Sequence, residues 1–168
     1  RVKFHRIRLH GPWQMNWFVG DLEWSPGRTL IDANEASLSG APVSVRLPGE
    51  VSLGEFWRAE NHAAIRPSAA RVVLVRHFNR PTGLDLKQMM LLGCWSSQSV
   101  VSAWLNEQAL PVADLNFSEP AFNCFSLSVA ALKTYNSVGL VFRVGEGDRF
   151  RIDQVALGIS ETCQEIPS

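Results

Sequence analysis

Five short apolar runs follow one another between residues 71 and 144, and this stretch limits the possible folds more than any other part of the chain. Val, Leu and aromatic residues make up most of each run, and Pro, Gly, Asn, Asp and Ser stand between them. Such runs are typical of consecutive β-strands in an all-β sandwich. The runs cover residues 71–81, 88–95, 100–106, 125–129 and 138–144. With flanking strands, they predict an antiparallel sandwich of two sheets with about eight or nine strands.

Two of the expected strands change parity partway, which predicts β-bulges. The apolar residues before residue 5 and after residue 6 fall on opposite parities, so a strand that buries both sets needs a bulge near His5–Arg6. The last run shows the same change and predicts a bulge at Asp153–Gln154. In the run 100–106, simple alternation places Val101 on one face with Leu105, and Trp104 on the other.

Composition limits the partners of the chain. Its 168 residues are of the size of one domain, and we expect residues 1–168 to form a single β-sandwich. Sixteen basic and sixteen acidic residues leave no net charge, so the basic surface typical of nucleic-acid binding is not expected. No apolar run approaches the roughly 18 residues of a membrane span, and no membrane partner is predicted. Because the chain begins with Arg1, we expect it to be part of a longer protein.

The three cysteines, Cys94, Cys124 and Cys163, are odd in number and show no Cys-x-x-Cys spacing. We interpret them as buried free thiols that behave as small apolar side chains. A Cys94–Cys124 disulfide stays open as an alternative if their strands are neighbours.

Motifs for catalysis and for cofactors are missing. The histidines lack the spacing that places two ligands on one helix face, and no nucleophile elbow, phosphate loop or dinucleotide motif occurs. No pair of carboxylates is placed for acid–base chemistry by any periodicity. We therefore expect no enzyme activity, no cofactor and no metal site. Acidic residues such as Asp21, Glu23 and Asp32 could bind a structural calcium ion, but we interpret them as solvated loop charges.

Candidate binding residues come from the enrichment in tryptophan, of which there are six. Indole rings stack on the apolar faces of sugar rings, and polar side chains then bind the hydroxyl groups. We expect Trp13, Trp17 and Trp95 in the core. The segment Glu50–Ser68 lacks strand character and is expected to be a short helical or irregular insertion. The candidate ligand-binding residues are Trp57, Arg58, Asn61, His62 and Trp104.

Several short motifs resemble the N-terminal sugar-binding jelly roll of family-2 glycoside hydrolases, the β-galactosidase and β-glucuronidase group, within the galactose-binding-like sandwiches. Leu9–Trp13 is similar to the Leu-x-Gly-x-Trp opening of that family, and Val45–Gly49 to its Val-Pro-Gly element. Val75–Pro81 is similar to a strand ending in Arg-x-Phe-x-x-Pro. Val101–Asn106 resembles the hairpin Val-x-Val-x-Leu-Asn-Gly, and Phe122–Leu132 resembles Phe-x-x-Asp-Val-Thr-x-Leu.

The resemblance implies a galactose-binding-like sandwich that binds carbohydrate without catalysis, because the catalytic carboxylates of that family lie in a separate barrel domain. The sequence departs from the family at Glu107, where Gly is usual, and after Phe122. The function predicted is a non-catalytic carbohydrate-binding module that takes an oligosaccharide or glycan. The alternative is a structural or protein–protein interaction sandwich, with a protein or neighbouring domain as partner, that has lost sugar binding.

Overall fold

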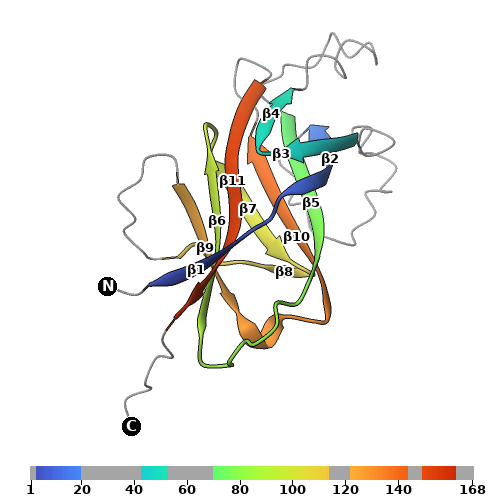
Figure 1. The fold of residues 1–168 in the computed structure, drawn as a ribbon. Coiled ribbons are helices and arrows are strands. Elements are labelled where there is room, and N and C mark those ends of the chain that lie inside the picture. Colours follow the sequence, from blue (N-terminus) through green and yellow to red (C-terminus); the bar gives the residue numbers. More distant parts are fainter. Residues whose placement is uncertain (1–2, 20–42, 53–69, 114–121, 144–148, 162–168) are drawn as a thin grey trace.

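Two antiparallel β-sheets pack against each other in the structure, which is a computed structural model (Figure 1). The structure describes residues 3–19, 43–52, 70–113, 122–143 and 149–161. This arrangement confirms the predicted all-β class with two antiparallel sheets. Eleven strands are described, more than the eight or nine expected, because the short strands β4 and β8 have no clear sequence pattern. No described helix has the length and apolarity needed to cross a membrane.

The first sheet has six strands in the order β3-β2-β5-β10-β7-β8. Its strands are β2 (Gly11–Val19), β3 (Val43–Leu47), β5 (Ala70–Asn79), β7 (Val100–Leu105), β8 (Gln108–Ala109) and β10 (Tyr135–Arg143). The turn between β7 and β8 begins at Asn106, whose φ of 53° lies in the left-handed region that asparagine tolerates better than most residues.

The second sheet has five strands, with β11 between β1 and β6, β9 beyond β6, and β4 paired to the other end of β11. Its strands are β1 (Phe4–Arg8), β4 (Gly49–Ser52), β6 (Met89–Ser96), β9 (Phe122–Ser128) and β11 (Arg149–Ser160). A 3₁₀ turn, η2 (Val129–Ala131), follows β9 and leads into β10.

The core lies between the sheets and contains one face of nearly every strand. Trp13, Met15 and Trp17 alternate along β2 and are at most 2% exposed, as predicted for the core. Leu92 and Leu157 oppose them from the second sheet and are also fully buried. At about 25 cal/mol per Å² of apolar surface, such side chains supply most of the free energy of folding.

The predicted bulge at Asp153–Gln154 is confirmed, because the pairing of β11 with β6 shifts register between Ile152 and Gln154. The predicted bulge at His5–Arg6 is wrong: β1 pairs with β11 in unbroken register. Both faces of this sheet are apolar here. Phe4 packs outside against a small second cluster, while Ile7 packs against the main core.

Two further expectations need correction. Val101 is 50% exposed and does not share the buried face of Leu105, because the pairing of β7 with β10 shifts register there and turns Val100 inward instead. Trp95 is half-buried on the outer face of the five-stranded sheet, not in the core. Its ring is covered by the Arg6 guanidinium, whose carbon lies 4.9 Å from the ring centroid.

The segment Glu50–Ser68 begins as strand, since β4 extends to Ser52 and pairs with β11. The expectation that it lacks strand character is wrong for these first residues. Val51 is buried in the core and anchors the strand. The rest of the segment lies outside the described residues.

Candidate functional site

Four of the five predicted site residues, Trp57, Arg58, Asn61 and His62, lie outside the described residues. The fifth, Trp104, is half-buried on the outer face of the six-stranded sheet, where it pairs with Gly139 of β10 and Ala109 of β8. The arrangement of these five residues as one site therefore stays a prediction.

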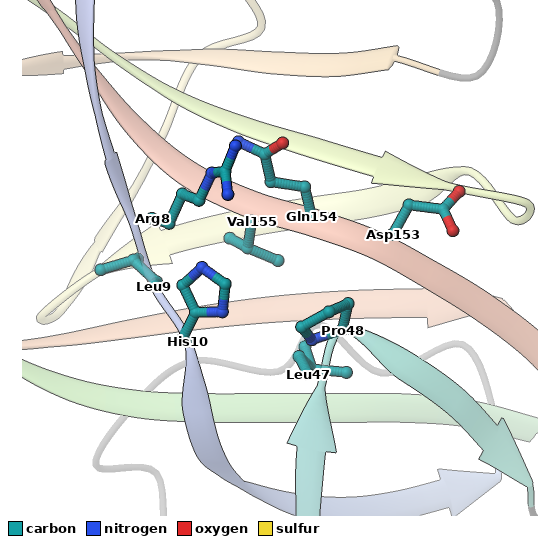
Figure 2. Close-up of a pocket in the computed structure, with 8 residues that line it drawn as sticks. All are labelled: Arg8, Leu9, His10, Leu47, Pro48, Asp153, Gln154 and Val155. Atoms are coloured by element: carbon teal, nitrogen blue, oxygen red, sulfur yellow. The ribbon is translucent and has the colours of Figure 1, made fainter.

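A pocket that the sequence did not indicate lies along one edge of β11 (Figure 2). We call it the edge pocket, and its volume is about 270 Å³. Its lining residues are Arg8, Leu9, His10, Leu47, Pro48, Asp153, Gln154 and Val155.

The edge pocket exists because two strands share one edge of β11 without meeting. β4 pairs with Arg149–Ile152, β1 pairs with Ala156–Ser160, and the bulged residues between them face neither strand. At this point β1 leaves for the six-stranded sheet and β4 arrives from it. The gap left by these two crossings, together with the bulge, forms the pocket.

The backbone around the edge pocket is held in place on both sides. The N–H of Leu9 donates to the Val155 carbonyl at 2.9 Å, and the Leu9 carbonyl accepts from Nε1 of Trp13 at 3.2 Å. On the other side the corner between β3 and β4 is tight. A Cβ at Gly49 would lie 2.8 Å from the Arg46 carbonyl oxygen, so this position requires glycine.

Four polar side chains surround the edge pocket. Figure 2 shows the Arg8 guanidinium and the Gln154 amide pointing toward one another, with His10 at the same end of the pocket below Arg8 and Asp153 at the opposite end. The Asp153 carboxylate accepts from Nε of Arg151 at 2.6 Å. Nε2 of Gln154 is buried and has no hydrogen-bond partner. These groups can bind a polar ligand, and among the described residues that line the pocket, Asp153 supplies the one carboxylate.

A second, more open pocket lies where β5 ends. We call it the corner pocket, and its volume is about 470 Å³. Two hydrogen bonds from Arg80 form its base: its N–H donates to the Thr134 carbonyl at 2.9 Å, and Nη1 donates to the Leu132 carbonyl at 2.9 Å. Its lining residues are Asn79, Arg80, Pro81, Thr82, Gly83, Leu84 and Thr134.

An exposed aromatic ring stands beside the corner pocket. Tyr135 is 60% exposed and lies directly across from Asn79 in the pairing of β10 with β5. Its ring stacks on His77, with centroids 5.2 Å apart and planes 10° apart. Stacking holds the tyrosine ring in one orientation while its other face stays open to a ligand.

Cys94 and Cys124 line neither pocket, and Cys163 lies outside the described residues. Cys94 and Cys124 are free, which confirms the interpretation as buried thiols and excludes a disulfide between them. Burial raises the pKa of Cys94 to about 12 and that of Cys124 to about 11, so neither is a ready nucleophile at neutral pH. Among the described residues, no three His, Cys, Asp or Glu side chains gather where they could bind a metal ion.

Sequence reasoning missed both pockets because each is built from residues without a shared motif. The edge pocket is lined by three chain segments that are far apart in sequence, and only the parity change at Asp153–Gln154 pointed to it. For the corner pocket, the one signal was the strand end at Asn79–Pro81.

The sequence matches no protein-family model, and no curated protein is similar to it at a significant level. Solved structures do share its fold. A β-glucuronidase from Faecalibacterium prausnitzii superposes on 94% of this chain with a TM-score of 0.54 at 14% identity. A Ruminococcus gnavus β-glucuronidase also covers 94% of this chain, with a TM-score of 0.54 at 13% identity. The Bifidobacterium dentium β-glucuronidase complexed with coumarin-3-O-glucuronide covers 83% of this chain, with a TM-score of 0.51 at 19% identity.

This chain spans only part of the length of those enzymes: 31% of the F. prausnitzii chain, 28% of the R. gnavus chain and 20% of the B. dentium chain. Identities this low show the fold alone. The predicted likeness to a β-sandwich of family-2 glycoside hydrolases is therefore confirmed as a likeness of fold.

Proposed function

We propose that this chain is a non-catalytic carbohydrate-binding sandwich, a single domain over residues 1–168 that belongs to a longer protein. One observation carries the proposal: an exposed tyrosine ring, fixed by stacking on His77, stands next to the corner pocket, whose lining includes an amide and two hydroxyl groups. A sugar ring stacks its apolar face on such an aromatic surface and offers its hydroxyl groups to polar neighbours.

The polar groups of the corner pocket suit sugar hydroxyls. Asn79 supplies an amide donor and acceptor, and Thr82 and Thr134 supply hydroxyl groups. None of these three side chains makes a hydrogen bond within the described parts of the chain, so all three are available to a ligand. The volume of about 470 Å³ is within the range of small-ligand sites.

The absence of acid–base groups at this pocket supports binding without hydrolysis. Glycosidases place two carboxylates about 5–9.5 Å apart around the scissile bond. The described residues that line the corner pocket include no Asp or Glu. The fold neighbours are carbohydrate-active enzymes, which supports a carbohydrate as the ligand.

The residues predicted from sequence extend the proposal. Trp57, Arg58, Asn61 and His62 form a candidate binding rim in the 53–69 segment, and Trp104 is a candidate platform on the sheet face that also carries Tyr135.

A glycan-array screen of the wild-type chain with three variants tests the proposal. Tyr135→Ala removes the ring, Tyr135→Phe keeps the ring as a matched control, and Trp57→Ala tests the predicted rim. We expect selective binding that Tyr135→Ala weakens by about five- to thirtyfold, since stacking and apolar contact contribute about 1–2 kcal/mol. Tyr135→Phe should retain most of the affinity.

A wild-type chain that binds no glycan would contradict the proposal and favour the structural or protein-interaction alternative. Glycan binding that survives Tyr135→Ala but is lost in Trp57→Ala would move the site to the sequence-predicted rim.

A further inference from the structure

The edge pocket contains hydrogen-bond donors that no acceptor satisfies. Nε2 of Gln154 is buried without a partner, and within the described residues no carboxylate forms an ion pair with Arg8. Figure 2 shows these two side chains pointing toward one another inside the pocket. A buried donor without an acceptor costs free energy, which a bound acceptor would recover.

The nearby acidic groups are already neutralised. Asp153 accepts from Arg151 at 2.6 Å, and Figure 2 shows its carboxylate at the end of the pocket away from Arg8. Glu50, on the neighbouring strand β4, lies 3.8 Å from the Arg149 guanidinium. His10 adds a further ring nitrogen to the lining. The balance of charge at the Arg8 end of the pocket is therefore positive.

The backbone that carries these donors is fixed before any ligand arrives. Arg8 is the last residue of β1 and pairs with Ala156, and the N–H of Leu9 donates to the Val155 carbonyl at 2.9 Å. The bulge of β11 sets the backbone position of Gln154. Binding then orders side chains but no backbone segment, which limits its entropic cost.

The size of the pocket selects a small ligand. Its volume of about 270 Å³ is below the roughly 300–1,000 Å³ of sites for drug-sized molecules. Its floor is apolar, from Leu9, Leu47 and Val155, which lowers the local dielectric constant and strengthens a charge-assisted hydrogen bond.

We propose that the edge pocket is an oxyanion-binding site, in which Arg8, Gln154 and His10 together bind a phosphate or carboxylate group. A carboxylate or phosphate oxygen accepts charge-assisted hydrogen bonds from the Arg8 guanidinium. It also accepts a hydrogen bond from Nε2 of Gln154. The site is separate from the corner pocket and does not depend on sugar binding there.

Titration by two-dimensional NMR, with sodium chloride used to match ionic strength, tests the site. The probes are inorganic phosphate and acetate, and the signals are the side-chain amide of Gln154 and Nε–H of Arg8. We expect saturable shifts at both. Arg8→Gln and Gln154→Met should each weaken binding about tenfold or more. Arg6→Gln is the matched control. It removes the same charge from the same strand, but the Arg6 guanidinium lies over the ring of Trp95 and does not line the edge pocket.

Saturation by acetate identifies a site for carboxylates, and saturation by phosphate alone identifies a site for phosphate groups; either supports the proposal. Shifts that never saturate in the wild-type chain, or an equal loss of affinity in Arg6→Gln and Arg8→Gln, would overturn it as a general charge effect. Tyr135→Ala should bind the anion with the affinity of the wild-type chain. The anion titration therefore tests the edge pocket independently of whether the corner pocket binds sugar.

Discussion

Cys94 and Cys124 show how the pleat of a sheet decides the surroundings of a residue. They lie on neighbouring strands, where Cys124 pairs with Gly93 and Cys94 pairs with Asn123. Adjacent positions point to opposite faces, so Cys94 enters the main core while Cys124 joins the outer cluster with Leu91. Two sulfur atoms on opposite faces of one sheet cannot form a disulfide.

The raised thiol pKa of Cys94 predicts a loss of stability at high pH. In the folded chain the pKa is about 12, compared with 9.0 for a free thiol, because burial disfavours the thiolate. Between these values the unfolded chain loses the proton while the folded chain keeps it, so the free energy of unfolding falls as pH rises from about 9 to about 12.

Urea unfolding of the wild-type chain and Cys94→Ala at pH 8 and pH 10.5 measures this effect. We expect the wild-type chain to lose more stability than the variant over this interval. An equal loss in both proteins would show that other titrating groups account for it.

At the scale of elements, a buried asparagine links β10 to the turn that follows β7. Asn136 is 1% exposed, and its Oδ1 accepts from the Lys133 N–H at 2.8 Å and from Nδ2 of Asn106 at 3.2 Å. Its own Nδ2 donates to the Lys133 carbonyl at 2.8 Å. Oδ1 of Asn106 accepts from the Ser137 N–H at 2.9 Å. These bonds shape the corner that presents Tyr135.

Asn136→Ala should therefore destabilise the fold strongly. The substitution leaves both backbone groups of Lys133 without their partner, and we expect a loss of about 2–4 kcal/mol in the free energy of unfolding. Chemical denaturation measures this loss. Asn79→Ala is the matched control, since Asn79 is exposed and its side chain makes no hydrogen bond in the described structure; it should change stability by less than about 0.5 kcal/mol. Equal effects would mean that the network contributes little.

Strands with strict alternation could be predicted from the sequence, and irregular ones could not. The bulge at Asp153–Gln154 was visible because apolar residues stand on both parities around it. The bulge at Val101 was hidden because Val100 and Val101 are both apolar, so either could have faced the core. β4 is four residues long and contributes one buried side chain, Val51, which is too little pattern to identify a strand.

The candidate sites were harder to predict than the strands, because a pocket depends on which strands become neighbours. Arg8, Pro48 and Gln154 meet only because β1 and β4 use the same edge of β11. No local sequence pattern predicts that β1 and β4 pair with the same edge of β11. Tyr135 similarly has no motif around it, and its exposure follows from its position on the outer face of β10.

At the scale of the whole molecule, β11 connects the five-stranded sheet. It pairs with β1, β4 and β6, and its buried residues Ile152, Val155 and Leu157 cover the core from that side. Figure 1 shows this strand, in red, running along the length of the sandwich. The stability of the sandwich therefore depends on one strand more than on the others.

A chain truncated after Arg143 should lose its fixed tertiary structure. It retains all strands of the six-stranded sheet, but β1 and β4 lose β11, with which they pair, and the inner face loses the part of its cover that β11 supplies. We expect binding of the dye ANS and loss of the near-ultraviolet circular dichroism of the buried tryptophans. A chain truncated after Glu161 is the control, because it keeps every described strand and should give native spectra. A native spectrum after truncation at Arg143 would contradict the central role of β11.

The position of β11 at the end of the strand order has a consequence for biosynthesis. Translation proceeds from the N-terminus, so the ribosome delivers β10 and completes the six-stranded sheet before the strand that joins β1, β4 and β6 has emerged. During that interval the nascent chain exposes the apolar face that contains Trp13 and Trp17. Exposed faces of this kind recruit chaperones or aggregate. Slow translation before residue 149 would lengthen this vulnerable period, and rapid release of the last strand would shorten it.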